Sequence, residues 1–293
     1  TENGLLLSDN VFGNLEDDAS RRDLSINALY YCPSENNIRD FTGGVLDIKN
    51  GIIRVIGTPK VRFREDPVRL LRVIRFAAKL DFTIDKETST AMYMLASKLK
   101  QVSTPRLFDE SLKLFMRGDS LKISILLQEY GLFEYILPQL YHRMENDDYA
   151  SKLAEQTFIN TDVRVKAKKR ITPAFIYAAL LWPTVHNTSL NLREKGQSPR
   201  DALTIAADQA IAIQVKFTAI PKRFTIPMRE IWALQISLQS KTKRRAQKLV
   251  SNPRFRAAYD FILLREQSGE NLDGLGEWWT TYQEHCNPHL LKP

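Results

Sequence analysis

From Pro59 almost to the end of the chain, apolar side chains recur about every 3.6 residues, the spacing of an α-helix that buries one face. The residues before Pro59 lack this spacing and hold short β-branched runs between asparagine and glycine turns. The sequence therefore predicts a mainly α protein. A partial α/β unit is followed by an all-helical part, with the boundary near residues 57–65.

Three short strands are expected in the first part of the chain, over residues 10–15, 38–41 and 52–57. Ser20 is expected to cap a helix from Arg21 to about Leu29, because a serine side chain can accept from the free amides of a first turn. The segment Asp40–Gly44 predicts a structural turn, since its glycines permit positive φ. It is not followed by the lysine of a phosphate-binding loop.

In the helical part, Pro67 lies in the expected first turn of a helix, where proline is favoured. Pro183 is expected to end another helix, because it lacks the amide that a helix interior needs. Residues 143–170 are polar and charged. The remaining helices are expected over residues 87–99, 104–117, 120–130, 132–141, 173–182, 198–215, 227–239, 241–250 and 254–267.

The balance of 42 basic and 34 acidic residues gives a net charge of +8, which favours polyanionic partners, nucleic acid first. Cys32 and Cys286 are too far apart in sequence to suggest a metal cluster or a disulfide framework, so we expect a reducing, cytoplasmic environment. No apolar run approaches membrane-spanning length and no signal peptide pattern is visible. The chain begins without methionine, and we expect it to be a piece of something longer.

One candidate site is an arginine-bearing helix over residues 65–76. Arg69, Arg72 and Arg75 are three residues apart, and Asp66 precedes Arg69 by one turn. A guanidinium can bind phosphate oxygens in pairs or hydrogen-bond a base edge, and a carboxylate can accept from the amino group of adenine. From the spacing alone, a solvated helix face with ion pairs remains an equal alternative.

A second candidate site combines Arg21, Arg22, Asp23 and Asn27. One carboxylate beside two arginines could be a metal ligand next to cations that bind a triphosphate. Asn27, one turn later, could hold ribose or phosphate. Taken alone, the segment is more often an ordinary helical turn whose acid is favoured by the helix dipole.

Two late basic runs, residues 164–170 and 241–248, could follow an RNA backbone. Solvated helix faces are the alternative. The four tryptophans are more typical of a packed core than of base stacking. The candidate RNA-binding residues are Lys168, Lys169, Arg170, Lys243, Arg244 and Arg245.

Together, the order and spacing of these segments resemble the class II nucleotidyltransferase family, which contains bacterial poly(A) polymerases and CCA-adding enzymes. The second to fifth motifs of that family match residues 21–29, 40–47, 65–76 and 105–113. Five further blocks resemble the poly(A) polymerases in particular, at residues 9–13, 29–31, 172–175, 220–223 and 252–260. The resemblance covers most of the chain.

The resemblance implies three parts: the end of a nucleotidyltransferase head over residues 1–60, a helical neck with a nucleotide-recognition helix over 61–140, and a helical RNA-binding body over 141–293. It also implies a reaction in which an RNA 3′-hydroxyl attacks the α-phosphate of ATP in the presence of Mg²⁺ or Mn²⁺, and pyrophosphate leaves. Asp23 would be a catalytic metal ligand. The nucleotide would be held by Arg22, Asn27, Asp66, Arg69, Arg72 and Arg75.

The resemblance has one departure, because the Gly-Gly segment and Asp-x-Asp pair of the family's first motif are not present. We therefore expect the parent enzyme to add AMP to RNA 3′ ends and promote RNA decay, with decay proteins as possible partners, and this polypeptide alone to be inactive. Two alternatives stay open. One is a tRNA CCA-adding enzyme, and the other is a non-catalytic RNA-binding module.

Overall fold

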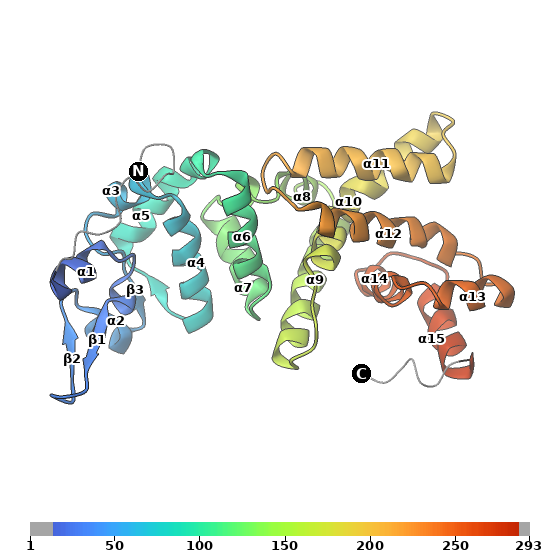
Figure 1. The fold of residues 1–293 in the computed structure, drawn as a ribbon. Coiled ribbons are helices and arrows are strands. Elements are labelled where there is room, and N and C mark those ends of the chain that lie inside the picture. The colour runs from blue at the N-terminus through green and yellow to red at the C-terminus, as the bar shows by residue number, and fades with distance from the viewer. Residues whose placement is uncertain (1–13, 287–293) are drawn as a thin grey trace. The chain divides into compact units, whose positions relative to one another are not determined.

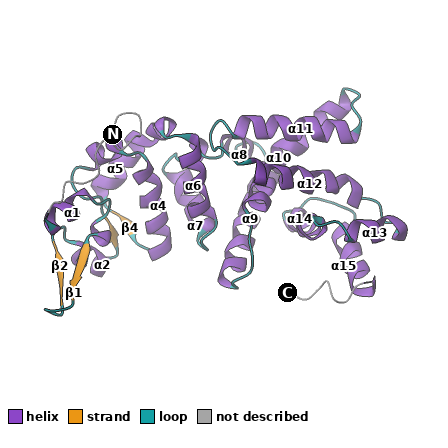
Figure 2. Cartoon of the chain, viewed as in Figure 1, coloured by secondary structure: helices purple, strands orange, loops and turns teal. Residues whose placement is uncertain are grey.

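The computed structural model describes residues 14–286, which form a mainly α protein as predicted. Helices dominate the described chain, and its strands all lie before residue 85 (Figures 1 and 2). The chain divides into two compact units, and the boundary between them in the sequence lies between Gln101 and Val102. The three-part division at residues 60 and 140 stays a prediction. The block at residues 9–13, and most of the strand expected over 10–15, lie outside the described residues.

The first unit begins with a short helix and a hairpin and continues as alternating helices and very short strands. The hairpin strands β1 and β2 pair antiparallel, with Leu29 opposite Asp40, and β3 pairs parallel with β4. Strands near residues 38 and 52 were predicted, although the second is only two residues long. The elements are α1 (Leu15–Arg21), η1 (Ser25–Asn27), β1 (Leu29–Cys32), β2 (Asn37–Asp40), α2 (Gly44–Asn50), β3 (Ile52–Ile53), α3 (Pro59–Glu65), α4 (Val68–Leu80), β4 (Thr83–Ile84), α5 (Lys86–Leu95) and η2 (Ala96–Gln101).

The helix expected from Arg21 to Leu29 is wrong, because α1 ends where that helix was to begin. Asn14 caps α1: its side chain accepts from the amide of Asp17 at 2.8 Å, and the Asp17 carboxylate accepts from the Asn14 amide at 3.2 Å. This capping box places acids in the first turn, where the helix dipole favours them. The chain then extends, and Leu24 forms a bridge with Val55.

Helix α4 provides the core of the first unit. Leu70, Leu71 and Ile74 are fully buried on it, at helical spacing. Each buried side chain of this kind stabilises the fold by roughly 1.5–3 kcal/mol. Because this face of α4 is fixed against the core, the position of the arginines on the rest of the helix is fixed with it.

The second unit consists of helices, and α10 is its centre. This helix packs against α8, α9, α11, α12 and α14. The elements are α6 (Thr104–Phe115), α7 (Ser120–Glu129), η3 (Phe133–Tyr135), α8 (Pro138–Met144), α9 (Asp148–Lys166), α10 (Pro173–Glu194), α11 (Pro199–Gln214), α12 (Lys222–Leu238), α13 (Lys243–Val250), α14 (Phe255–Gln267) and α15 (Leu275–Cys286). None of the described helices is long and apolar enough to cross a membrane.

The helices of this unit differ from the sequence prediction in several places. Helix α12 begins at Lys222 and not at Pro227, which lies inside it, and α15 was not predicted. Pro183 does not end α10, which continues to Glu194 with the proline buried inside it. Packing on several sides of α10 compensates for the hydrogen bond that the proline removes. Helix α9 was not predicted, because only a narrow face of this polar segment is buried; Asp147 caps it by accepting from two amides. Trp232 and Trp279 are fully buried, which confirms their expected place in the core.

Candidate nucleotide-binding site

The two arginine-bearing segments meet in the first unit through Asp23 and Arg72. The Nε of Arg72 donates to the Oδ2 of Asp23, and the side-chain amide of Asn27 donates to its Oδ1 at 3.2 Å. The Asp23 side chain is 10% exposed and that of Arg72 is 35% exposed. The backbone of Asp23 is also fixed, since its carbonyl accepts from the amide of Ile56 at 3.1 Å. Residues 49 positions apart in sequence thus form one ion pair.

The carboxyl of Asp23 is held in its ionised form. Burial alone would raise its pKa, but the hydrogen bond and charge of Arg72 lower the pKa below its ordinary value. An ionised carboxylate is a suitable ligand for Mg²⁺ or Mn²⁺. In the described part of the chain, no group of three or more His, Cys, Asp or Glu residues could hold a metal ion. Asp23 therefore fits the role of one ligand, and it does not form a complete metal site with its described neighbours.

Arg22 is fixed by two residues that the sequence did not single out, Asp18 and Tyr30. Its Nε and Nη2 donate to Asp18 at 3.1 and 3.0 Å, its Nη1 donates to the carbonyl of Asn27 at 3.1 Å, and its guanidinium lies 5.3 Å from the centre of the Tyr30 ring. The hydrogen bond from Tyr30, together with the arginine contacts, holds the pKa of the Asp18 carboxyl well below its usual range. Arg22 is thus oriented while its side chain stays 45% exposed.

Arg69 is fixed from the neighbouring helix α3. Its Nη1 donates to Glu65 at 3.0 Å and to the carbonyl of Arg62 at 2.9 Å. Arg62 in turn donates through Nη2 to the carbonyls of Arg21 and Arg22, at 2.7 and 2.6 Å. Arg62 therefore ties the end of α1 to the segment that precedes α4, and no sequence signal indicated this role.

Asp66 and Arg75 lie at the two ends of the predicted arginine series. Asp66 is the residue at which α3 ends. Its carboxylate accepts from the amide of Val68 at 3.2 Å, which places the Asp66 side chain at the start of α4, three residues before Arg69. The guanidinium of Arg75 lies 4.6 Å from the centre of the Phe76 ring. The face of α4 is therefore not a row of intrahelical ion pairs, because Arg72 pairs with a carboxylate from another element.

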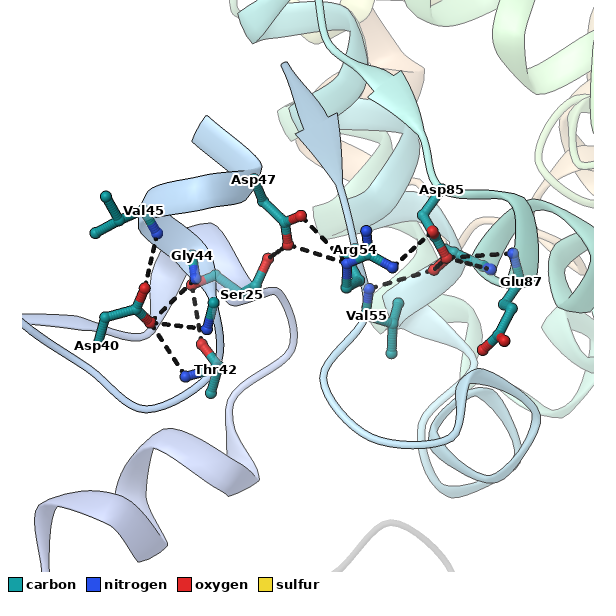
Figure 3. Close-up of polar contacts among 12 residues, drawn as sticks. Ser25, Asp40, Thr42, Gly44, Val45, Asp47, Arg54, Val55, Asp85 and Glu87 are labelled. Atoms are coloured by element: carbon teal, nitrogen blue, oxygen red, sulfur yellow. Dashed lines mark hydrogen bonds and ion pairs between the residues drawn. The ribbon is translucent and has the colours of Figure 1, made fainter. Parts of the chain in front are cut away.

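The glycine segment after β2 is the structural turn that was predicted (Figure 3). The Oδ1 of Asp40 accepts from the amides of Thr42, Gly43 and Gly44 at 3.1, 2.9 and 3.0 Å, and its Oδ2 accepts from Val45 at 2.9 Å. Gly43 has a φ of 80°, a conformation that favours glycine. Burial would raise the pKa of Asp40, but these backbone amides lower it.

This turn also supports the segment that carries Asp23. A Cβ on Gly44 would lie 2.3 Å from the carbonyl oxygen of Ser25, so the close approach requires glycine. The buried hydroxyl of Ser25 donates to Asp47 at 2.6 Å, and Arg54 joins Asp47 to Asp85 through hydrogen bonds of 3.1 and 2.7 Å (Figure 3). The amide of Ser25 donates to the carbonyl of Arg54 at 3.0 Å. The chain two residues after Asp23 is therefore held on both sides.

The predicted RNA-binding residues lie on the second unit, in two separate places. Lys168, Lys169 and Arg170 are exposed in the loop after α9, where Lys168 has a φ of 55°. The other three, Lys243 to Arg245, are exposed in the first turn of α13. Their role in RNA binding stays a prediction.

Three segments of the chain match known families. Residues 5–54 match the poly A polymerase head domain, residues 81–143 a probable RNA and SrmB-binding site of polymerase A, and residues 195–290 the arginine-rich C-terminus of polymerase A. Poly(A) polymerase I of Escherichia coli is 41% identical over 98% of this chain, and that of Haemophilus influenzae is 41% identical over 96%. The chain spans 63% of the length of each.

CCA-adding enzymes are more distant in sequence and similar in fold. The enzyme of Bacillus subtilis is 28% identical over 78% of this chain and 59% of its own length. The structure of the Thermotoga maritima CCA-adding enzyme complexed with tRNA superposes with a TM-score of 0.61 at 19% identity, covering 92% of this chain and 60% of that one. By sequence, and with a fold that agrees, the chain belongs to the class II tRNA nucleotidyltransferase and poly(A) polymerase family.

Proposed function

We propose that the full-length protein is a polynucleotide adenylyltransferase that adds AMP from ATP to RNA 3′ ends. The ion pair between Asp23 and Arg72 carries this proposal, because it joins the second and fourth family motifs into one group of side chains. The relatives that match almost the whole chain at 40–41% identity are poly(A) polymerases, which supports adenylation over CCA addition. RNA-decay proteins as partners and a cytoplasmic location belong to the same proposal.

In this function, each fixed side chain has a distinct task. Bound Mg²⁺ or Mn²⁺ would activate the attacking hydroxyl and stabilise charge on the leaving pyrophosphate. Asp23 would supply one ionised oxygen ligand, and Arg22 and Arg72 would donate to phosphate oxygens. Asn27, which donates to Asp23, would keep that carboxylate oriented and contact the ribose or a phosphate.

The start of α4 would select the base. The carboxylate of Asp66 is an acceptor and the guanidinium of Arg69 is a donor, so together they can match the donor and acceptor on the edge of adenine. Glu65 and the Arg62 carbonyl hold Arg69 in place. Arg75, further along α4, would add positive charge for the triphosphate.

Primer extension by the full-length protein tests this proposal. With labelled ATP and an RNA primer, we expect adenylate addition that Asp23→Asn abolishes and that the exposed-surface variant Arg39→Ala leaves unchanged. CTP-dependent extension of tRNA that ends before its CCA would instead assign the chain to the CCA-adding enzymes. RNA binding without transfer of either nucleotide by the full-length protein would support a non-catalytic module.

A further inference from the structure

The second unit contains a cavity of about 650 Å³ to which the nucleotidyl transfer reaction assigns no role. Helices α9, α10, α12 and α14 line it, and these helices lie together in Figure 1. Five arginines line the cavity, namely Arg164, Arg170, Arg223, Arg254 and Arg256, against a single carboxylate, that of Asp260. An excess of four positive charges in one cavity favours an anionic ligand.

Two of these arginines are available for a ligand. Within residues 14–286, the exposed guanidiniums of Arg170 and Arg223 form no hydrogen bond or ion pair. Arg164 donates to the carbonyl of Arg170 at 3.0 Å and thereby holds the loop after α9 at the edge of the cavity. The position of Arg170 is thus fixed through its backbone while its side chain remains free to bind.

The other charged side chains at the cavity form ion pairs, and the single carboxylate among them repels an anion only weakly. Arg256 pairs with Asp260 at 3.0 Å, and Arg254 pairs with Glu230, which lies outside this cavity, at 2.6 Å. Burial raises the pKa of Asp260, although Arg256 and Arg164 lower it. The charge of Asp260 is therefore compensated by Arg256, and the net charge of the residues that line the cavity stays positive.

The cavity also has an aromatic lining. Phe175, near the start of α10, and Phe224, near the start of α12, are both partly buried and line it. The guanidinium of Arg223 lies 5.0 Å from the centre of the Phe224 ring. A planar aromatic face beside guanidinium groups is the combination that binds a base and its phosphate. The cavity volume lies within the range of roughly 300–1,000 Å³ that is typical of small-ligand sites.

We propose that this cavity binds one nucleotide of an RNA strand, with the phosphate at Arg170 and Arg223 and the base against Phe175 or Phe224. An acidic peptide would satisfy the arginines but would leave the aromatic lining without a planar partner, so RNA fits better. The proposal rests on the proposed function only in taking RNA as the substrate. Arg164 and Arg170 belong to the basic run 164–170 that the sequence connected with RNA, whereas Arg223, Arg254 and Arg256 come from α12 and the start of α14 and were not candidates.

Salt-dependent binding of a labelled single-stranded oligoadenylate, measured by fluorescence anisotropy on the full-length protein, tests the phosphate contacts. We expect Arg170→Ala and Arg223→Ala each to weaken binding and to reduce the slope of log K against log salt by about 0.7, the value for one lost phosphate contact. Arg193→Ala is the matched control: it removes the same charge from the exposed last turn of α10, on the order of 27 Å along the helix from Phe175 at about 1.5 Å per residue. Equal salt slopes for the cavity variants and the wild type would overturn the proposal. The same loss of affinity and slope in Arg193→Ala as in the cavity variants would also overturn it.

A second variant tests the base contact. Phe224→Leu keeps apolar volume but removes the aromatic face, and we expect at least about fivefold weaker binding with an unchanged salt slope. Unchanged affinity in both Phe224→Leu and Phe175→Leu would refute base stacking. Displacement of the oligonucleotide from wild-type protein by free ATP, with loss of ATP binding in Arg170→Ala, would assign the cavity to a free nucleotide and would also overturn the proposal. Because binding is measured without metal or transfer, its failure is distinct from failure of adenylation at Asp23.

Discussion

Replacing Gly44 with alanine should disrupt the segment that carries Asp23. The new Cβ would lie 2.3 Å from the carbonyl oxygen of Ser25, whereas contacts of this kind are essentially never closer than 3.0 Å. The backbone must therefore move by at least 0.7 Å, the difference between 3.0 and 2.3 Å. No flexible side chain can absorb this movement, because the clash is with backbone atoms.

The magnitude follows from how firmly Ser25 is held. Ser25 is buried, its hydroxyl donates to Asp47 at 2.6 Å, and its amide donates to Arg54 at 3.0 Å. Overpacking costs about 1–3 kcal/mol, and with so little freedom at Ser25 we expect the free energy of unfolding to fall by about 2–3 kcal/mol. Because Asp23 is two residues away, a shift on the order of 1 Å should lower adenylation by about 100-fold.

Gly43→Ala is the matched control for this prediction. Gly43 has a φ of 80°, but a Cβ there would meet no atom within 4 Å. It should therefore cost only the strain of a left-handed alanine, about 1–2 kcal/mol, and leave Asp23 in place. Urea denaturation gives the stabilities, and primer extension gives the activities, with both variants made in the full-length protein. If Gly44→Ala is as stable and as active as Gly43→Ala, the close contact with Ser25 is not a constraint and the reasoning is refuted.

Two further predictions concern buried ion pairs. Arg72→Met should raise the pKa of Asp23 relative to the wild type, because burial raises this pKa and the hydrogen bond and charge of Arg72 lower it. Since the wild-type pKa is lowered, the stability that the pair contributes is present at neutral pH and is lost as the pH falls through the folded pKa. An unchanged pKa in an NMR titration would contradict this. Arg265→Met should lower the free energy of unfolding by about 3–5 kcal/mol, since it leaves the mostly buried Glu270 without its cation and with only the hydrogen bond from Tyr149. Arg229→Ala, in an exposed pair, should cost about 1 kcal/mol or less in the same denaturation experiment.

The sequence predicted those parts of the site whose signals lie within one short segment. Helix α4 is an example, because Pro67 and the apolar spacing define its start and its buried face without help from other elements. The glycine turn is another, since Gly43 has the positive φ that its residue type allows. The wrong helix at Arg21 had a local signal as well: Asn14 and Asp17 have the spacing of a capping box, which places the start of α1 at Leu15.

Contacts between distant segments could not be predicted in this way. Tyr30 meets Asp18 and Arg22 only because the chain turns back after α1, and nothing in its residue type or spacing indicates this contact. The pair of Asp18 and Arg22 is different, because its i,i+4 spacing is a local signal. Helix α10 passes through Pro183 because the surrounding helices bury it, which is a property of the assembled unit. The arginines of the cavity are likewise brought together by the packing of α9, α12 and α14.

The contact between Asp23 and Arg72 changes how the arginine helix is understood. From the sequence, Arg72 was expected to bind phosphate as an unpaired cation. In the structure its charge is already compensated by Asp23. On the proposed function, one ion pair would give way to two, because the Asp23 carboxylate would contact the metal and the Arg72 guanidinium would contact a phosphate. Neither exchange is favourable alone, because each would leave a partly buried charge without its partner. On the proposed function, the pair would therefore favour binding of the nucleotide together with its metal over binding of either one separately.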